Sequence, residues 1–141
     1  MTTDSEIYGL VLAGGFSKRM NRDKANLVYP VHGKPQWKVT ADCIRPFCKK
    51  VFLSIREGQA LDGVDEGSPE MIVDQDSSQG PFSGFLSAMH RVPDQAFLVV
   101  ACDLPLLTSS ILQEIIQHRG SAEAIAYRSS SDDLPEPLCA L

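Results

Sequence analysis

The sequence predicts a three-layer α/β sandwich built on a mostly parallel β-sheet. Short apolar runs typical of buried strands alternate along the chain with segments whose apolar residues recur at helical spacing. One run, residues 96–102, has seven residues without a charge, as expected of a central parallel strand covered on both faces. A chain of 141 residues is long enough for one such domain, which we expect to span residues 1–141.

The first half of the chain resembles a strand–helix–strand unit. Residues 7–12 form an apolar run that ends at two glycines, and residues 51–55 form a second run. Between them a helix is expected from Gln36, because Pro35 suits a first helical turn and Pro46 ends the pattern. The predicted apolar face of this helix consists of Val39, Cys43, Ile44 and Phe47.

The second half continues the alternation. Residues 71–73 form a short apolar run, which predicts a strand. Gly80-Pro81 is then expected to open a helix. The residues that would form the core stripe of that helix are Phe82, Phe85, Leu86 and Met89. The run at residues 96–102 ends abruptly at Asp103, and a further helix is expected over residues 108–118.

The C-terminal part completes the predicted elements. Ser110 and Gln113 have the spacing of a capping box for the last helix. Residues 122–127 predict another short strand. Because the chain stops at Leu141, inside an apolar run, we expect the sequence to be a fragment that lacks the C-terminal part of its domain.

Composition and charge narrow the class of protein. The net charge of −5 argues against a surface that binds nucleic acid. No apolar run approaches the roughly 20 residues of a membrane helix, so no membrane partner is expected. The four cysteines have neither Cys-x-x-Cys nor zinc-site spacing. Reduced cysteines and the lack of a signal-peptide pattern favour the cytoplasm.

A polar loop after the first strand is the first candidate site. Gly14-Gly15 lets main-chain N–H groups approach a ligand without interference from Cβ atoms. Such a turn, where it opens toward a helix, can bind phosphate oxygens. The side chains that add a hydroxyl and positive charge around it are Ser17, Lys18, Arg19 and Lys24. The alternative is an ordinary strand–helix turn with a solvated basic loop. Walker A and dinucleotide-binding glycine spacings are absent from the sequence.

The whole loop is more specific than its glycines. It reads Leu12-Ala13-Gly14-Gly15-x-Ser17-x-Arg19-Met20-x-x-Asp23-Lys24. This string resembles the signature loop of nucleotidyltransferases with a Rossmann-like fold, and most closely that of the MobA family of molybdenum cofactor guanylyltransferases. The resemblance implies that the loop wraps the triphosphate of GTP, with nucleotide contacts from Leu12, Ala13, Gly14 and Gly15. The cations implied to neutralise the phosphates are Arg19 and Lys24. Asn21 stands where the family usually has glycine, and asparagine tolerates a left-handed backbone.

Two aspartates at strand ends complete the predicted site. The string Asp74-(x5)-Gly80-Pro81-Phe82-x-Gly84 resembles the family's second motif, whose acid helps to hold the nucleotide. Asp76 is the alternative acid, and loop solvation or helix capping is the alternative role. Asp103-Leu104-Pro105 resembles the family's Asp-x-Pro motif, whose aspartate ligates the metal. A carboxylate at the mouth of an apolar strand needs a partner, and Mg²⁺ bridging to phosphates would suit it. The alternative for Asp103 is a helix cap.

The resemblance implies transfer of GMP from GTP to a molybdopterin-type molybdenum cofactor, with release of pyrophosphate. Arg19, Lys24 and Asp103 would be the catalytic residues, Asp103 the Mg²⁺ ligand, and Asp74 a nucleotide contact. The small-molecule partners would be GTP and molybdopterin, with transient contact to other proteins of cofactor biosynthesis. The alternatives are a molybdopterin cytidylyltransferase, a sugar-phosphate nucleotidyltransferase and a non-catalytic nucleotide-binding module.

Overall fold

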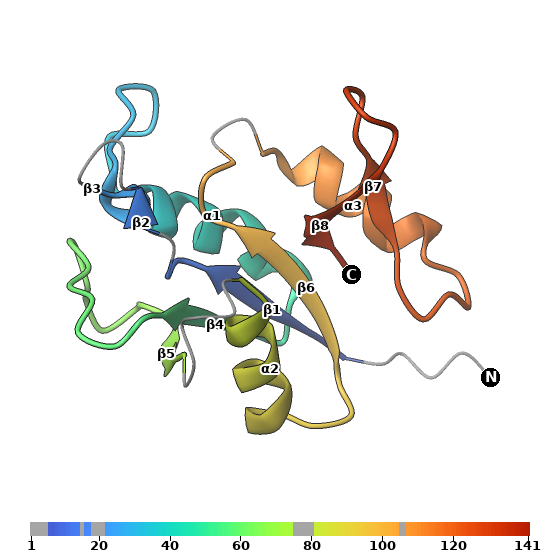
Figure 1. The fold of residues 1–141 in the computed structure, drawn as a ribbon, viewed down its shortest axis with the longest axis horizontal. Helices are drawn as coiled ribbons and strands as arrows, with labels where there is room; N and C mark the ends of the chain where they lie inside the picture. Colours follow the sequence, from blue (N-terminus) through green and yellow to red (C-terminus); the bar gives the residue numbers. More distant parts are fainter. Residues whose placement is uncertain (1–5, 15, 18–21, 75–80, 105–106) are drawn as a thin grey trace.

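The computed structural model describes residues 6–14, 16–17, 22–74, 81–104 and 107–141. Over these residues the large sheet has six strands in the order β5-β4-β1-β6-β8-β7. These strands are β1 (Ile7–Leu12), β4 (Lys50–Ile55), β5 (Glu70–Val73), β6 (Ala96–Ala101), β7 (Ala126–Arg128) and β8 (Pro135–Ala140). The other elements include the two-stranded pair β2 (Phe16–Ser17) and β3 (Arg22–Asp23) and the helices α1 (Gln36–Ile44), α2 (Pro81–Arg91) and α3 (Ser109–His118). Strands β5, β4, β1 and β6 are parallel, whereas β8 is antiparallel to β6 and β7, so the mostly parallel sheet is confirmed (Figure 1).

Helices cover the sheet on both faces, with α2 on one side and α1 and α3 on the other (Figure 1). The register aligns neighbouring strands so that alternate side chains point to opposite layers. The residues that pack with α2 include Leu10, Phe52 and Val99. Those that pack with α1 and α3 include Val11, Leu53 and Val100. The predicted three-layer sandwich with a Rossmann-like parallel core is therefore confirmed.

Helix α1 begins at Gln36 as predicted, but it buries a different face. Its buried residues are Gln36, Trp37, Thr40, Ala41 and Ile44. Of the predicted face, only Ile44 is fully buried, and Phe47 lies beyond the helix in a short 3-10 turn. The physical reason is Trp37, which is 0% exposed and is the largest fully buried side chain of the described residues. Burying its indole rotates the helix relative to the predicted stripe.

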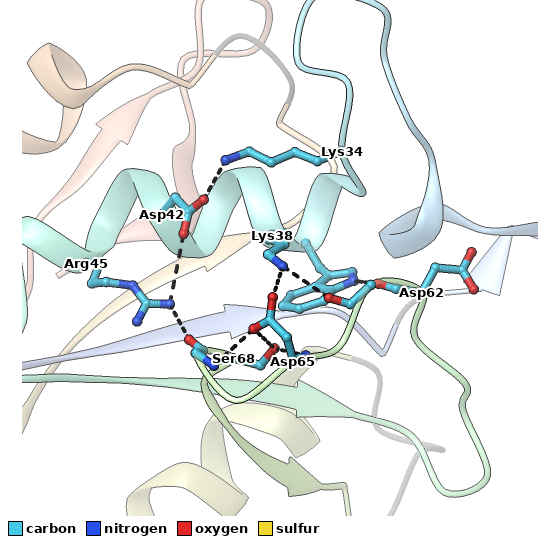
Figure 2. A network of polar contacts seen from close by, with 10 residues as sticks. Lys34, Lys38, Asp42, Arg45, Asp62, Asp65 and Ser68 are labelled. Atoms are coloured by element: carbon cyan, nitrogen blue, oxygen red, sulfur yellow. Dashed lines mark hydrogen bonds and ion pairs between the residues drawn. The ribbon is translucent and has the colours of Figure 1, made fainter.

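The loop between β4 and β5 lies along the outer side of α1 and is bound to it by polar contacts. Trp37 Nε1 donates to the carbonyl of Asp62 at 3.0 Å. Lys38 on the next position of α1 pairs with the Asp65 carboxylate, and the Arg45 guanidinium reaches the same loop (Figure 2). The buried tryptophan therefore has its polar atom satisfied by the loop that covers the helix.

Helix α2 also begins where predicted, but only part of its predicted stripe lies in the core, where the Phe85 ring packs edge-on against Phe97. Phe82 is 57% exposed and Met89 43% exposed. The fully buried positions of the helix are instead its small residues Ser83, Gly84 and Ala88. A Cβ on Gly84 would lie 2.3 Å from Ser54 Oγ on β4, so glycine allows α2 to approach the sheet closely. Close packing of these small residues against the sheet, and not the size of the apolar side chains, decides which face of α2 is buried.

Helix α3 starts slightly differently from the prediction. Thr108 is its N-cap, and the Thr108 hydroxyl oxygen accepts from the Ile111 N–H at 3.5 Å. Ser110 therefore lies inside the first turn and does not begin a capping box, which corrects that prediction. The buried residues of the helix are Leu112 and Ile115.

The last strands join the sheet beside β6. Strand β8 lies between β6 and β7, and Leu141 exchanges two backbone hydrogen bonds with Ile125, at 2.8 and 2.9 Å. Of the strand predicted over residues 122–127, only the end is observed as part of β7. Among the described residues, none of the helices has the length and apolar character needed to cross a bilayer.

Candidate functional site

The candidate site lies at the edge of the sheet where the four parallel strands end. Backbone pairing continues one residue beyond the strands, since Ala13 N–H donates to Ser54 O at 2.9 Å and Cys102 N–H donates to Leu12 O at 3.1 Å. On the other side, Asp74 N–H donates to the Ile55 carbonyl at 2.7 Å. The residues that follow these strands therefore meet at one edge, as the sequence predicts for a parallel α/β sheet.

Lys24 and Asp103 meet at this edge although 79 positions separate them. Lys24 opens a 3-10 helix at Lys24–Asn26, and Asp103 follows β6. Lys24 Nζ lies 3.4 Å from Asp103 Oδ2, and the two side chains are 42% and 46% exposed. Such an exposed pair contributes little to stability. Its place beside the glycine turn instead leaves one positive and one negative group accessible to a ligand.

Lys24 provides the Asp103 carboxylate with a partner of opposite charge. The carboxylate is half-exposed and has a lysine partner, so the cost of an isolated buried charge does not by itself require a metal. Among the described residues, no three His, Cys, Asp or Glu side chains gather closely enough to hold a metal ion on their own. A Mg²⁺ ion that brings its own phosphate and water ligands needs only one or two protein carboxylates, and Asp103 fits that demand.

Asp74 lies between the glycine turn and a buried serine. Ser54, which is 1% exposed, donates its hydroxyl to Asp74 Oδ1 at 2.5 Å. A Cβ on Gly14 would lie 3.1 Å from Asp74 Oδ2, so the turn and the aspartate are in close contact. Burial raises the pKa of Asp74 above its usual 3.8, and the Ser54 hydrogen bond opposes part of that rise. The sequence-predicted residues Gly14 and Asp74 are therefore brought together.

The raised pKa of Asp74 has a consequence for stability. The folded state binds this proton more tightly than the unfolded chain does, so the contribution of Asp74 to stability is most favourable below pH 3.8 and is lost as pH rises through the folded pKa. Asp74→Asn keeps an acceptor for Ser54 and removes the charge. We expect this variant to raise the melting temperature at pH 7 by a few degrees and to leave it nearly unchanged at pH 3.5.

Thermal unfolding followed by circular dichroism measures both values. Asp65→Asn is the control of opposite sign, because the hydrogen bond from Lys38 lowers the pKa of Asp65. That control should reduce the melting temperature at pH 7 only slightly, because the Lys38–Asp65 pair is exposed. A fall in the melting temperature of Asp74→Asn at pH 7 would contradict the assignment of Asp74 as a carboxylate held at a cost to folding.

Three residues at this edge were not predicted from the sequence as site residues. Arg56, directly after β4, makes two contacts with the Asp23 carboxylate, at 2.7 and 3.2 Å, and donates to the Gly14 carbonyl at 3.2 Å. Gln59 Nε2 donates to the Ala13 carbonyl at 2.7 Å and to Asp23 Oδ1 at 2.8 Å. Only Asp23 belongs to the recognised loop string, and the other two lie in a polar loop whose sequence carries no motif.

Some predicted site residues lie outside the described part of the chain. Gly15 and Arg19 are among them, as is Asp76, the alternative to Asp74. Leu12, Ala13, Gly14, Lys24, Asp74 and Asp103 are described, and all belong to the edge formed by β1, β4, β5 and β6. No helix directly follows the glycine turn in the described residues, because β3 and the 3-10 helix precede α1.

Parallel strands that end together at a polar edge make this chain an α/β protein with a Rossmann-like fold. The comparison with known families narrows that class. The chain belongs to the family of the MobA-like NTP transferase domain, whose model matches residues 9–141.

Curated relatives agree with this family. The chain is 37% identical over 138 residues to the molybdenum cofactor biosynthesis bifunctional protein of Synechocystis sp., covering 97% of this chain and 39% of the relative. It is 29% identical over 136 residues to the molybdenum cofactor guanylyltransferase of Shewanella piezotolerans, covering 96% of this chain and 65% of the relative. The chain thus spans less than two thirds of the length of either relative.

Solved structures agree on the fold. The Rv0371c protein of Mycobacterium tuberculosis superposes with a TM-score of 0.69 at 25% identity, over 90% of this chain and 67% of that protein. The molybdopterin-guanine dinucleotide biosynthesis protein A of Archaeoglobus fulgidus has the same TM-score at 22% identity, over 94% of this chain and 65% of that protein. A manganese complex of Rv0371c matches with a TM-score of 0.63 at 23% identity, over 87% of this chain and 64% of that structure.

Proposed function

We propose that this chain transfers GMP from GTP to a molybdopterin-type molybdenum cofactor and releases pyrophosphate. The proposal rests on the family, on relatives named molybdenum cofactor guanylyltransferase, and above all on one observation. That observation is the 3.4 Å pair of Lys24 and Asp103 at the edge where the Gly14 turn and Asp74 also lie. A lysine and a glycine turn suit a bound triphosphate, and an accessible carboxylate suits the divalent metal ion that accompanies it.

In the proposed reaction a phosphate oxygen of the acceptor attacks the α-phosphorus of GTP. The bond between this phosphorus and the oxygen that bridges to the β-phosphate breaks, and pyrophosphate leaves with that electron pair. No protein nucleophile is required, so the protein contributes positioning and charge neutralisation. Lys24 and Arg19 would neutralise the phosphates, main-chain N–H groups of Gly14 and Gly15 would hold them, and Asp74 would orient the nucleoside. The Ala13 N–H is excluded from this role, because it donates to the Ser54 carbonyl.

Asp103 would hold the divalent metal, which when bound supplies Lewis acidity and a template for the phosphate oxygens. We propose Mg²⁺ as the physiological ion. Mn²⁺ belongs in the same experiments, because the Rv0371c protein has been solved as a manganese complex. Chelation with EDTA is expected to abolish pyrophosphate release.

The proposal is tested by titrating the chain with GTP, CTP and UTP, with and without Mg²⁺ or Mn²⁺. We expect GTP with metal to raise the melting temperature more than CTP or UTP does, and we expect pyrophosphate release only when molybdopterin is added. Preferred stabilisation and turnover with CTP would favour the cytidylyltransferase. Stabilisation without any pyrophosphate release, with a sugar phosphate or molybdopterin as acceptor, would favour the non-catalytic binding module.

We place the reaction in the cytoplasm, where thiols stay reduced. All four cysteines are free thiols. The second substrate is expected to be delivered by transient contact with other proteins of cofactor biosynthesis.

A further inference from the structure

The contacts of Asp23, Arg56 and Gln59 point to a role beyond folding. Asp23 is 14% exposed and Arg56 27% exposed, so this ion pair is more buried than the Lys24–Asp103 pair. The Arg56 guanidinium donates to both oxygens of the Asp23 carboxylate. This bidentate geometry fixes the orientation of the two side chains in addition to pairing their charges. Gln59 is oriented too, because its Oε1 accepts from the Arg56 N–H at 3.0 Å while its Nε2 donates.

Asp23 is the N-cap of the 3-10 helix that begins at Lys24, but its side chain makes no capping hydrogen bond. An aspartate at an N-cap ordinarily accepts from the first turn of its own helix. Here the carboxylate is turned instead to Arg56 and Gln59, which come from a different part of the chain. The residue immediately before Lys24 is therefore anchored from outside its own segment.

The same two side chains hold the carbonyl groups of the glycine turn. Gln59 donates to the Ala13 carbonyl and Arg56 to the Gly14 carbonyl. The Ala13 carbonyl and the Gly14 N–H belong to one trans peptide, and in a planar trans peptide these groups point in opposite directions. Holding the carbonyl toward Gln59 thus directs the Gly14 N–H away from Gln59.

We infer that Asp23, Arg56 and Gln59 form a positioning clamp for the phosphate-binding groups of the site. The clamp joins the glycine turn to the segment that presents Lys24, so the Gly14 N–H and the Lys24 ammonium keep one relative position before the ligand binds. Its three residues would act through Gly14 and Lys24, so we assign them as positioning residues. The inference rests on the proposed function for the identity of the ligand, a nucleoside triphosphate.

Arg56→Gln tests the clamp in the whole chain, with Arg91→Gln as the matched control. Arg91 makes an ion pair with Glu70 on the far side of the fold, so its loss removes the same chemistry away from the site. We expect Arg56→Gln to weaken binding of inorganic tripolyphosphate, measured by calorimetry, and to lower kcat/KM for GTP by about 10- to 100-fold. Arg91→Gln should match the wild type in both. Unchanged affinity, kcat and KM in folded Arg56→Gln would overturn the clamp.

Two further variants separate positioning from charge and from folding. Arg56→Lys keeps the charge but cannot bridge both carboxylate oxygens and the Gly14 carbonyl, so it should resemble Arg56→Gln; wild-type kinetics would overturn the inference. Gln59→Leu removes no charge and should also reduce the affinity, which covers the case in which Arg56→Gln does not fold. In a Lys24→Met background, Arg56→Gln should reduce the tripolyphosphate affinity and kcat/KM much less than it does in the wild type, because both substitutions affect the Lys24 ammonium group. Fully additive losses would contradict that coupling.

Failure of the clamp and failure of the proposed function give different results. A wild-type chain that binds tripolyphosphate but transfers no GMP contradicts the function, and the clamp is then decided by the affinities of the Arg56 variants. A wild-type chain that binds no polyphosphate overturns both.

Discussion

Asp103→Asn is expected to slow pyrophosphate release from GTP by about 10²–10³-fold, the order of loss seen when one preorganised electrostatic group is removed from an active site. The substitution keeps the size of the side chain and removes the charge that would hold the metal. It should hardly change the fold, because the Asp103 carboxylate is 46% exposed and its pairing with Lys24 is solvent-screened. Initial rates at saturating GTP and Mg²⁺ measure the effect.

Asp42→Asn is the matched control for that experiment. Asp42 is 44% exposed and pairs with Lys34 at 2.6 Å, across α1 from the loop that holds Asp65 (Figure 2). Neither residue belongs to the candidate site. Asp42→Asn should keep the wild-type rate. Turnover of Asp103→Asn within about twofold of the wild type would remove Asp103 from the site, whatever the melting temperatures of the two variants. Loss of turnover in both Asp103→Asn and Asp42→Asn would show that removal of any exposed carboxylate slows the reaction, and it would contradict a specific role for Asp103.

Features set by local sequence could be predicted here. The uncharged run that becomes β6 and the aspartate that ends it define the central strand and the position of Asp103 without knowledge of any distant residue. The parallel order of the strands then explains why Lys24, Asp74 and Asp103 reach the same edge. The helix starts at Gln36 and Pro81 follow equally from proline placement.

Features set by long-range packing could not be predicted. The buried face of α2 depends on Gly84 meeting Ser54, which lies 30 positions earlier on another element. The choice of Trp37 for the core depends on a loop carbonyl 25 positions away. Arg56 and Gln59 reach Asp23, Ala13 and Gly14 across 33 to 46 positions. Neither periodicity nor a local motif records such contacts, so the clamp became visible only in the structure.

Trp37→Ala is expected to lower the free energy of unfolding by about 3–5 kcal/mol, the largest stability effect that we predict. The side chain is 0% exposed and packs in the cluster shared by α1, α3 and one face of the sheet. Truncation would leave a large cavity and would also leave the Asp62 carbonyl without the indole donor. Since domains are stable by only about 5–15 kcal/mol, this loss would populate the unfolded state measurably.

Urea unfolding followed by far-UV circular dichroism gives the free energy by linear extrapolation. Fluorescence is unsuitable for the comparison, because Trp37 is the single tryptophan of the chain. Trp37→Phe separates the two contributions: it retains an aromatic ring in the core but lacks the N–H, so a loss of about 1–3 kcal/mol is expected. Phe82→Ala removes an aromatic ring that is 57% exposed and should cost no more than about 0.5 kcal/mol. If Phe82→Ala destabilised the chain as much as Trp37→Ala, the core would follow the stripe predicted from sequence periodicity, and the packing of both helices described above would be wrong.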